Sequence, residues 1–174
     1  MKKLQEILNG IETVQVTGST DVQVHALQLD SRKVGKNDLF IAVKGSAADG
    51  HHFIPNVIEQ GAGVIVCECM PTEKNNEVTY VQVANARKAS ALLAANFYDQ
   101  PSQKLKLVGV TGTNGKTTIA TLLYEVYKDA GHKSGLLSTI ENKIDGEVIP
   151  QMRNGLAGLS YIGIKRFISL DRFH

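Results

Sequence analysis

One stretch of the chain has residue types and spacing suited to phosphate chemistry. Residues 111–118 read Thr-Gly-Thr-Asn-Gly-Lys-Thr-Thr, after a short apolar run and before a segment with helical periodicity. Glycines let backbone N–H groups turn toward anionic oxygens, and a following helix presents its N-terminus to them. Lys116 can neutralise β- and γ-phosphate charge, while the Thr117 hydroxyl can bind Mg²⁺. The strict Walker A spacing would place a glycine where the chain has Val110, so the pattern predicts a variant phosphate-binding loop.

The segments on both sides of this loop are those that a nucleotide site requires. Residues 105–110 are mostly apolar and predict a short buried parallel strand. After the loop, apolar residues recur at helical spacing until Gly131, which can end a helix. They are Ile119, Leu122, Leu123, Val126 and Tyr127. The strand–loop–helix order favours phosphate binding, and an ordinary turn before a helix is the alternative.

A second group of polar residues flanks the apolar run 39–43. Residues 29–32 read Leu-Asp-Ser-Arg before it, and residues 44–51 read Lys-Gly-Ser-Ala-Ala-Asp-Gly-His after it. The Arg32 guanidinium suits a pyrophosphate or a carboxylate, and Gly45 and Gly50 would let the backbone approach a ligand. Plain turns with an exposed arginine explain these residues equally well.

Composition limits the class of protein. A chain of 174 residues with 43% apolar residues suits one domain, or a small domain plus part of another. The net charge of +2 mixes both signs and aromatic residues make up only 6%, so we expect no nucleic-acid partner. No apolar window of about 18 residues occurs, and the N-terminus lacks a signal-peptide core. We therefore expect no membrane insertion and a cytoplasmic location.

Cysteine and histidine give no sign of a metal centre. Cys67 and Cys69 are the only cysteines, too few and too close together for a four-ligand zinc site. The five histidines show no ligand spacing, and no Ser/His/Asp set can be assembled from their positions.

Residues 1–98 are predicted to form a first unit. Alternating valines at 14–16 and 22–24 predict two antiparallel strands, and apolar runs at 39–43, 64–66 and 78–83 predict three more. Helices are expected before Gly10, before Gly61 and over 86–98, the last capped by Asn85 with Leu92 and Leu93 facing inward. The helix before Gly61 lies between two predicted strands and so makes a β-α-β unit.

Residues 99–103 are the best linker in the chain, because Pro101 interrupts the pattern among polar residues. The second unit, 104–150, then contains the phosphate loop, a strand over 134–140, and an Asp145-Gly146 signal for a tight hairpin. Thr139 is a candidate nucleotide or Mg²⁺ contact, with a plain strand-end threonine as the alternative. Because strands 105–110 and 135–140 have few partners, we expect this unit to expose strand edges and apolar faces.

The phosphate loop resembles that of the Mur ligases, ATP-dependent amide-forming enzymes of peptidoglycan synthesis. The folylpolyglutamate synthetases are similar but typically have Gly-Lys-Gly-Ser where this chain has Gly-Lys-Thr-Thr. Outside the loop, Asp-Ser-Arg, Gly-x-x-Asp-Leu-Phe-x-Ala-x-x-Gly and Ala-Asp-Gly-His resemble the N-terminal uridine-nucleotide domain of the tripeptide-synthetase branch of that family. The resemblance runs nearly from residue 1 to residue 150.

This resemblance implies a fold class and two sites. The fold is α/β, with a small mixed α/β uridine-nucleotide-binding domain followed by the start of a P-loop central domain. The implied ATP-binding residues are Gly112, Thr113, Asn114, Gly115, Lys116, Thr117 and Thr118. Of these, Thr117 is also implied to bind Mg²⁺. The residues implied to touch the UDP-sugar are Leu29, Ser31, Ser46, Ala47 and Ala48, the last three mostly through their backbone.

The resemblance also implies a reaction. ATP phosphorylates the terminal carboxylate of UDP-N-acetylmuramoyl-L-alanyl-D-glutamate, and the amine of diaminopimelate or lysine attacks the acyl phosphate. The implied partners are this UDP-N-acetylmuramoyl-dipeptide, ATP, and an amino acid selected by a C-terminal domain that the sequence lacks. No complete catalytic set is present, so we expect that the isolated chain does not ligate.

Residues 151–174 depart from the family pattern. Their abrupt change indicates a frame change or truncation, and a genuine divergent C-terminal element is the alternative. A different class of function also stays open, namely a non-enzymatic remnant that binds a uridine nucleotide or ATP. A stand-alone P-loop ATPase or GTPase is disfavoured, because no strand ending in a Walker B aspartate follows the loop.

Overall fold

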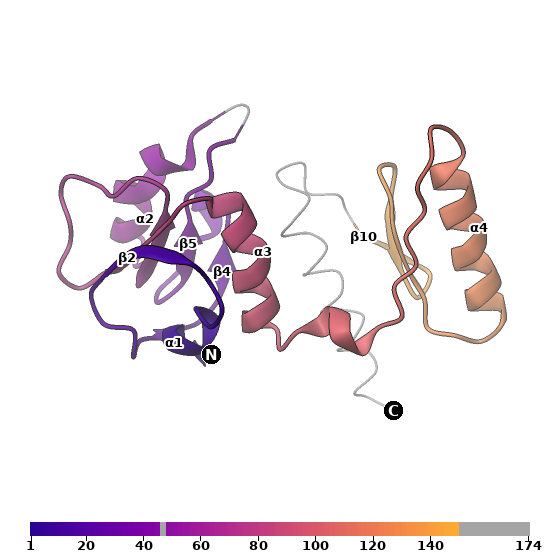
Figure 1. Ribbon diagram of the computed structural model, residues 1–174, viewed down its shortest axis with the longest axis horizontal. Coiled ribbons are helices and arrows are strands. Elements are labelled where there is room, and N and C mark those ends of the chain that lie inside the picture. Colours follow the sequence, from indigo (N-terminus) through magenta and orange to yellow (C-terminus); the bar gives the residue numbers. More distant parts are fainter. Residues whose placement is uncertain (46–47, 150–174) are drawn as a thin grey trace. The chain divides into compact units, whose positions relative to one another are not determined.

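The computed structural model describes residues 1–45 and 48–149, and the chain divides into two units, Met1–Asp99 and Gln100–His174 (Figure 1). The division lies within the segment 99–103 that the sequence predicts as a linker. Asp99 and Gln100 both have positive φ, and the 3₁₀ helix η3 (Pro101–Lys104) follows. Ser46, Ala47 and the predicted tail 151–174 lie outside the described residues.

Unit 1 is built on a five-stranded sheet with the order β2-β7-β6-β5-β4. The strands are β2 (Thr13–Thr17), β4 (Leu27–Gln28), β5 (Leu39–Ile41), β6 (Val64–Cys67) and β7 (Thr79–Val83). Strands β4 to β7 run parallel, and β2 pairs antiparallel with β7 at one edge. The carboxyl ends of four strands therefore lie at one edge of the sheet.

Helices cover both faces of this sheet. Successive residues of a strand point to opposite faces, so the apolar strands contribute to two cores. Helices α1 (Leu4–Ile7) and α3 (Ala86–Phe97) pack with Leu39, Val64 and Val81, among others, in one core. Helix α2 (Ile54–Glu59) packs with Phe40, Ile65 and Tyr80 in the other. The expected β-α-β unit is confirmed as β5-α2-β6.

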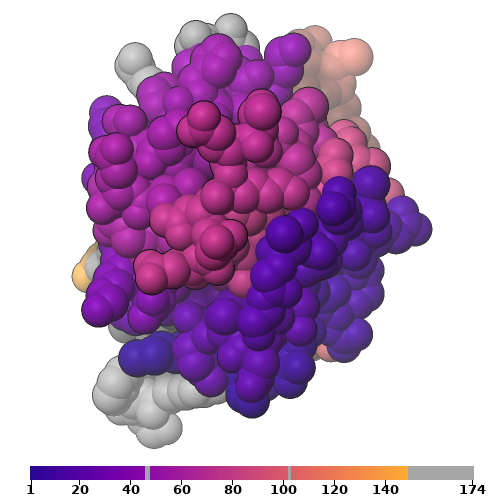
Figure 2. All heavy atoms as spheres, turned by 90° about the vertical axis from the view of Figure 1, so that its left-hand side faces the viewer, coloured from indigo at the N-terminus to yellow at the C-terminus, as the bar shows by residue number. Residues whose placement is uncertain are grey.

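The predicted pairing of 14–16 with 22–24 is wrong. β2 pairs with β7, while β3 (Gln23–Val24) pairs antiparallel with β1 (Lys2–Lys3) in a separate two-stranded sheet. Gly18, which follows β2, has φ +108°, and a Cβ there would lie 2.9 Å from the Thr79 hydroxyl oxygen. The backbone after β2 therefore passes close to the first residue of β7. In Figure 2 the indigo N-terminal residues lie against the magenta segment that is distant from them in sequence.

The predicted helix signals in unit 1 hold with one exception. The Asn85 side chain caps α3 by accepting a hydrogen bond from the Lys88 N–H at 2.8 Å. Gly61, with φ +99°, follows the end of α2. Leu93 is fully buried, but Leu92 is 43% exposed, so its predicted inward position is wrong.

Unit 2 contains α4 (Lys116–Asp129) and a three-stranded antiparallel sheet, ordered β10-β9-β8. Its strands are β8 (Gly135–Leu137), β9 (Asn142–Ile144) and β10 (Glu147–Ile149). The predicted hairpin is confirmed between β9 and β10, where Asp145 and Gly146 have φ +48° and +90°, as a type I′ turn requires. The helix also ends as predicted, since Gly131 has φ +82° just beyond it.

The predicted strand 105–110 is wrong. These residues belong to no strand, and Leu107 and Val108 are each 66% exposed. The three strands described after the loop pair only with one another, so none of them pairs with residues 105–110. The strand predicted over 134–140 is shortened to β8. The expected exposure of apolar faces in this unit is confirmed.

Candidate functional site

The predicted phosphate loop, residues 111–118, lies at the N-terminus of α4, which begins at Lys116. Gly112 and Gly115 have φ +150° and +74°, and Gly115 is the N-cap of the helix. The Ile119 N–H donates to the Gly115 carbonyl at 2.9 Å, which starts the helical hydrogen-bond ladder. The N–H groups of the first turn have no intrahelical acceptor, and the helix dipole adds partial positive charge there. The local backbone therefore suits an anion.

The Lys116 side chain turns back over the loop. Its ammonium group donates to the carbonyl oxygens of Gly112 at 2.5 Å and Thr113 at 3.2 Å. These contacts hold the cation against the loop residues that the sequence assigns to phosphate. An ammonium group has three N–H donors, so Lys116 can donate to a phosphate oxygen without giving up both carbonyl contacts.

A cavity of about 800 Å³ adjoins the loop within unit 2. Its walls come from the segment 104–110, from α4 and from residues 132–139. Lys116, Thr117 and Thr139 all line it, so the structure brings the predicted Thr139 to the same cavity as the two predicted phosphate-loop residues. Gly112, Thr113, Asn114 and Thr118 belong to the loop and its helix but not to this lining.

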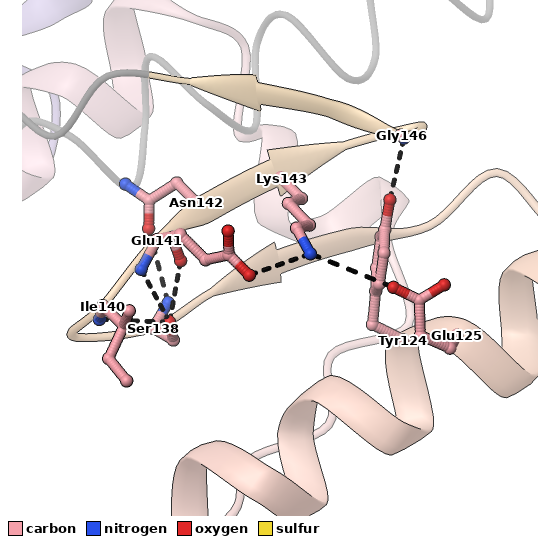
Figure 3. A network of polar contacts seen from close by, with 8 residues as sticks. All are labelled: Tyr124, Glu125, Ser138, Ile140, Glu141, Asn142, Lys143 and Gly146. Atoms are coloured by element: carbon pink, nitrogen blue, oxygen red, sulfur yellow. Dashed lines mark hydrogen bonds and ion pairs between the residues drawn. The ribbon is translucent and has the colours of Figure 1, made fainter.

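A polar network holds α4 against the hairpin (Figure 3). The Tyr124 hydroxyl accepts a hydrogen bond from the Gly146 N–H at 2.7 Å, and the Lys143 ammonium lies 5.9 Å from the Tyr124 ring centroid. Lys143 also pairs with Glu141 at 2.8 Å and with Glu125 at 3.9 Å. The Glu141 carboxylate, which hydrogen-bonds the ammonium, raises the pKa of Lys143. Helix α4 thus reaches the hairpin through Tyr124 and Glu125, eight and nine residues beyond Lys116.

Of the predicted uridine-nucleotide residues, Leu29, Ser31 and Ala48 are described, and they lie in unit 1 at the carboxyl edge of its sheet. Leu29 and Ser31 follow β4, and the loop 42–50 follows β5, which is its parallel neighbour. Open α/β sheets bind ligands at this edge. The strand topology therefore brings the two predicted segments to one edge, although they are separated by a strand in the sequence.

The segment after β4 is held by two sets of contacts. Ser31 begins the 3₁₀ turn η1 (Ser31–Lys33), which is capped by the Asp30 carboxylate accepting from the Arg32 N–H at 3.1 Å. The Gln60 amide, oriented with its nitrogen toward the turn, donates to the Ser31 carbonyl at 2.9 Å. Gln60 ends α2, so the helix between the two predicted segments supports the first of them.

Arg32 is engaged with its own neighbour. Its guanidinium makes two parallel hydrogen bonds to the Asp30 carboxylate, at 2.9 and 2.8 Å. Hydrogen bonding from Arg32 lowers the pKa of Asp30 to about 2. The arginine that the sequence offered for a pyrophosphate is therefore already paired with a carboxylate.

Gly45 and Gly50, in the segment after β5, allow backbone atoms of that segment to lie close together. A Cβ on Gly50 would lie 2.8 Å from the Val43 backbone nitrogen, and one on Gly45 would lie 2.9 Å from the Ala48 carbonyl oxygen. The Gly45 N–H donates to that same oxygen at 2.9 Å. The sequence predicts that these glycines let a ligand approach the backbone. In the structure, it is the loop's own backbone that comes close to them. Ala48 itself is exposed.

Sequence reasoning missed His51. Its side chain is 16% exposed and contacts the Asp49 carboxylate on one side and the backbone after β6 on the other. The local signal was its place at the end of the Ala-Asp-Gly-His motif, whereas its partner at Glu68 lies 17 residues away.

The described residues contain neither a metal cluster nor a membrane-spanning helix. Within residues 1–45 and 48–149, no group of three His, Cys, Asp or Glu side chains could hold a metal ion. Cys67 is buried in β6, and burial raises the pKa of its thiol to about 11. None of the described helices is both long and apolar enough to cross a bilayer.

Comparison with known proteins identifies the family. The model of the Mur ligase family catalytic domain matches residues 23–98, and that of the Mur ligase middle domain matches residues 110–169. The chain belongs to the Mur ligase family. The middle-domain match passes residue 150, so the segment 151–174, which we expected to match nothing, is matched in part.

The Mur ligase relatives are much longer than this chain. UDP-N-acetylmuramoyl-L-alanyl-D-glutamate--2,6-diaminopimelate ligase of Bacteroides fragilis is 51% identical over 148 residues, which is 85% of this chain and 30% of the relative. The protein of the same name from Cytophaga hutchinsonii is 49% identical over 148 residues, 84% of this chain and 30% of its own length. The chain therefore spans about a third of these Mur ligases.

Solved Mur ligase structures share the α/β fold. A structure titled UDP-N-acetylmuramoyl-L-alanyl-D-glutamate--2,6-diaminopimelate ligase superposes with a TM-score of 0.71 at 23% identity, covering 97% of this chain and 34% of that one. A UDP-N-acetylmuramoylalanyl-D-glutamyl-2,6-diaminopimelate--D-alanyl-D-alanyl ligase from Acinetobacter baumannii gives a TM-score of 0.54 at 27% identity, covering 73% and 28%. The predicted α/β class of fold is confirmed.

Proposed function

We propose that this chain supplies the uridine-nucleotide domain and the phosphate loop of an ATP-dependent ligase of peptidoglycan synthesis. The ligase adds diaminopimelate to UDP-N-acetylmuramoyl-L-alanyl-D-glutamate in the cytoplasm. The observation that carries the proposal is the 51% identity over 148 residues to a ligase named for that reaction. Two features of the geometry support it independently. The predicted phosphate loop leads into the N-terminus of α4, where anions bind. The parallel strands β4 and β5 end at the same edge of the sheet, where open α/β sheets bind ligands.

The loop residues have distinct roles in this proposal. Backbone N–H groups of 112–118 receive the ATP phosphates, and the Lys116 ammonium group donates to phosphate oxygens. The Thr117 hydroxyl would hold Mg²⁺ in this chain. Such a site fits Mg²⁺, which commonly keeps several waters and binds through substrate phosphates. The bound metal would neutralise charge on the transferring phosphoryl group.

At the other site, Leu29, Ser31 and Ala48 contact the uridine nucleotide, together with Ser46 and Ala47. The Ser31 hydroxyl is the donor that can reach a nucleotide oxygen, and Leu29, which is partly exposed, offers an apolar surface. Ser46 and Ala47 enter through the resemblance alone.

The alternative function is a non-enzymatic remnant that binds a uridine nucleotide or ATP. A chimaera distinguishes this alternative from the proposed ligase. The 148 aligned residues of this chain replace their counterpart in the Bacteroides fragilis ligase, which supplies the rest of the enzyme. We expect amide formation from UDP-N-acetylmuramoyl-L-alanyl-D-glutamate, ATP and diaminopimelate. A chimaera that folds and binds the UDP-dipeptide but forms no amide would support the remnant and overturn the ligase proposal.

Matched substitutions in the chimaera test the loop. Lys116→Ala should lower kcat at least a hundredfold, because charge stabilisation of a transferring phosphoryl group is worth several kcal/mol. Lys128→Ala, near the opposite end of the same helix, should leave kcat within about twofold, because exposed surface charges contribute little. Equal losses in the two variants would contradict the assignment of Lys116.

A further inference from the structure

We propose that Asp38 is a positioning residue for the segment 29–34 and fixes both ends of that segment for uridine-nucleotide binding. The proposal rests on the function assigned above to Leu29 and Ser31, and it does not involve the loop after β5. Asp38 belongs to the Gly-x-x-Asp-Leu-Phe pattern of the family resemblance, which assigns it no role. What points to it is a buried carboxylate whose hydrogen bonds go to residues on both sides of the segment.

The Asp38 carboxylate is buried just before β5, and its side chain is only 4% exposed. One oxygen, Oδ2, accepts hydrogen bonds from the Gln28 side-chain amide at 3.1 Å and from the Gly35 N–H at 2.9 Å. The other oxygen, Oδ1, lies 3.3 Å from Nδ1 of the His25 ring, which is largely exposed. A buried carboxylate is costly unless donors surround it, so the folded chain has a physical reason to keep these contacts.

The two donors on Oδ2 lie directly outside the two ends of the segment. Gln28 is the last residue of β4 and precedes Leu29, whereas Gly35 follows Val34. Both ends of the segment are therefore hydrogen-bonded to the same oxygen atom, which keeps them close together. The segment 29–34 is a loop whose base is fixed by one carboxylate.

The turn inside the segment has contacts of its own. The Asp30 carboxylate caps η1 by accepting from the Arg32 N–H, and the Gln60 amide donates to the Ser31 carbonyl. These contacts shape the turn around Ser31 and support it from α2. They act on the middle of the segment, whereas the hydrogen bonds to Asp38 act on its ends.

The two ends of the segment are held in different ways. Val34 is buried in the core beside α2, so packing also holds the far end. Leu29, at the near end, is 38% exposed. The chain there is attached to the sheet by the two-residue strand β4 and by the Gln28 side chain. Loss of the Gln28 hydrogen bond should therefore loosen the near end more than the far end.

The consequence of this attachment falls on ligand binding. A segment that is already ordered loses less conformational freedom when a ligand binds it, so pre-organisation raises affinity. Without the hydrogen bond from Gln28 to Asp38, Leu29 and Ser31 gain conformational freedom in the unbound chain. We expect the affinity for the uridine nucleotide to fall about fivefold, the size of one net hydrogen bond.

Three substitutions test the carboxylate and its donor. Gln28→Met keeps the length of the side chain but removes the amide donor. Asp38→Asn keeps an oxygen that can occupy the position of Oδ2 and accept from both donors, whereas Asp38→Leu keeps none. Binding of UDP-N-acetylmuramoyl-L-alanyl-D-glutamate to chain 1–174 is measured by calorimetry. We expect the Kd to rise about fivefold in Gln28→Met and at least tenfold in Asp38→Leu, and to stay within about twofold in Asp38→Asn.

The matched control is Ile65→Val, which removes one methylene group from the buried core at β6 and lowers stability without a change in the segment 29–34. If Asp38 and Gln28 only stabilise the fold, the Kd should follow the thermal midpoint, and Ile65→Val should weaken binding as much as a Gln28→Met variant of equal midpoint. A positioning role predicts an unchanged Kd for Ile65→Val.

NMR relaxation gives a second readout that does not depend on a ligand. The backbone order parameters of Leu29 and Ser31 should fall in Gln28→Met and stay unchanged in Ile65→Val. If Asp38→Leu fails to fold, the comparison of Gln28→Met with Asp38→Asn tests the same oxygen.

The outcomes distinguish the proposed function from the positioning role. An original chain that binds no UDP-dipeptide overturns the proposed function of this edge and the positioning role with it. An original chain that binds, with a Gln28→Met variant that binds equally well, overturns the positioning role alone. An Asp38→Asn variant as weak as Asp38→Leu overturns the specific role of the acceptor at Oδ2.

Discussion

The two units of the chain place similar apolar patterns in different surroundings. Helix α3 in unit 1 and helix α4 in unit 2 are amphipathic and of similar length. Leu93 of α3 is fully buried against the five-stranded sheet, whereas Leu122 of α4 is 60% exposed. The difference lies in what surrounds each helix, because unit 1 offers apolar strands on both faces and unit 2 offers a small antiparallel sheet.

The same contrast holds for the strands. β5 and β6 have parallel neighbours on both sides and are buried along their whole length. Residues 105–110 have a similar apolar content but pair with no described strand and are largely exposed. An apolar run thus becomes a buried strand only where another strand satisfies its backbone groups and a helix covers its side chains. Local pattern predicts the potential for burial, and the neighbours decide whether it occurs.

The largest expected effect on stability comes from replacing one leucine by alanine in each helix. Leu93→Ala should lower the free energy of unfolding of unit 1 by about 3 kcal/mol, because it leaves a cavity in a closed core. Leu122→Ala should change that of unit 2 by less than about 0.5 kcal/mol, because the side chain is already in water. Urea unfolding followed by circular dichroism and by hydrogen exchange assigns each loss to its unit. Equal losses would mean that α4 is covered as completely as α3.

A smaller effect tests the contact that holds α4 to the hairpin. Tyr124→Phe removes the hydroxyl that accepts from the Gly146 N–H, and should cost unit 2 about 1 kcal/mol. The control is Tyr127→Phe on the same helix, which is largely exposed and should cost nothing measurable. Hydrogen exchange at Gly146 provides the measurement. Protection at Gly146 that survives Tyr124→Phe would show that the network in Figure 3 does not anchor the helix.

The smallest effect concerns Asp30 in unit 1. Its folded-state pKa of about 2 lies below the ordinary value of 3.8, so its contribution to stability is present above about pH 4 and is lost as the pH falls toward 2. Arg32→Gln should return the Asp30 pKa toward 3.8, because hydrogen bonding from Arg32 is the largest cause of the shift. Carboxyl carbon NMR follows this titration directly. If the titration midpoint of Asp30 is unchanged in Arg32→Gln, the lowered pKa must come from the hydrogen bond of the residue-32 backbone N–H instead.

Much of the local structure could be predicted because its causes are local. The Asn85 cap, the glycine after α2, the Asp145-Gly146 turn and the helix after the phosphate loop each depend on a few adjacent residues. The two segments assigned to the uridine nucleotide could be found by resemblance, and parallel pairing of β4 and β5 explains why they reach one edge.

Other features could not be predicted because they depend on contacts between distant residues. Alternation at 14–16 indicates a strand but does not say that its partner is β7. Helical spacing on α4 indicates an apolar stripe but not whether anything covers it. Gly45 and Gly50 signal close approach, yet whether a ligand or the loop itself approaches them depends on the folded backbone.

The sequence by itself determined the family resemblance, the phosphate loop, the β-α-β unit and the hairpin, since each is written in residues close together along the chain. Only the tertiary structure decided which strands pair, which apolar faces are covered, and that His51 meets the backbone at Glu68. The physical reason is that hydrogen bonds and burial are satisfied between neighbours in space. A one-dimensional pattern specifies which face of an element is apolar, and packing specifies what that face meets.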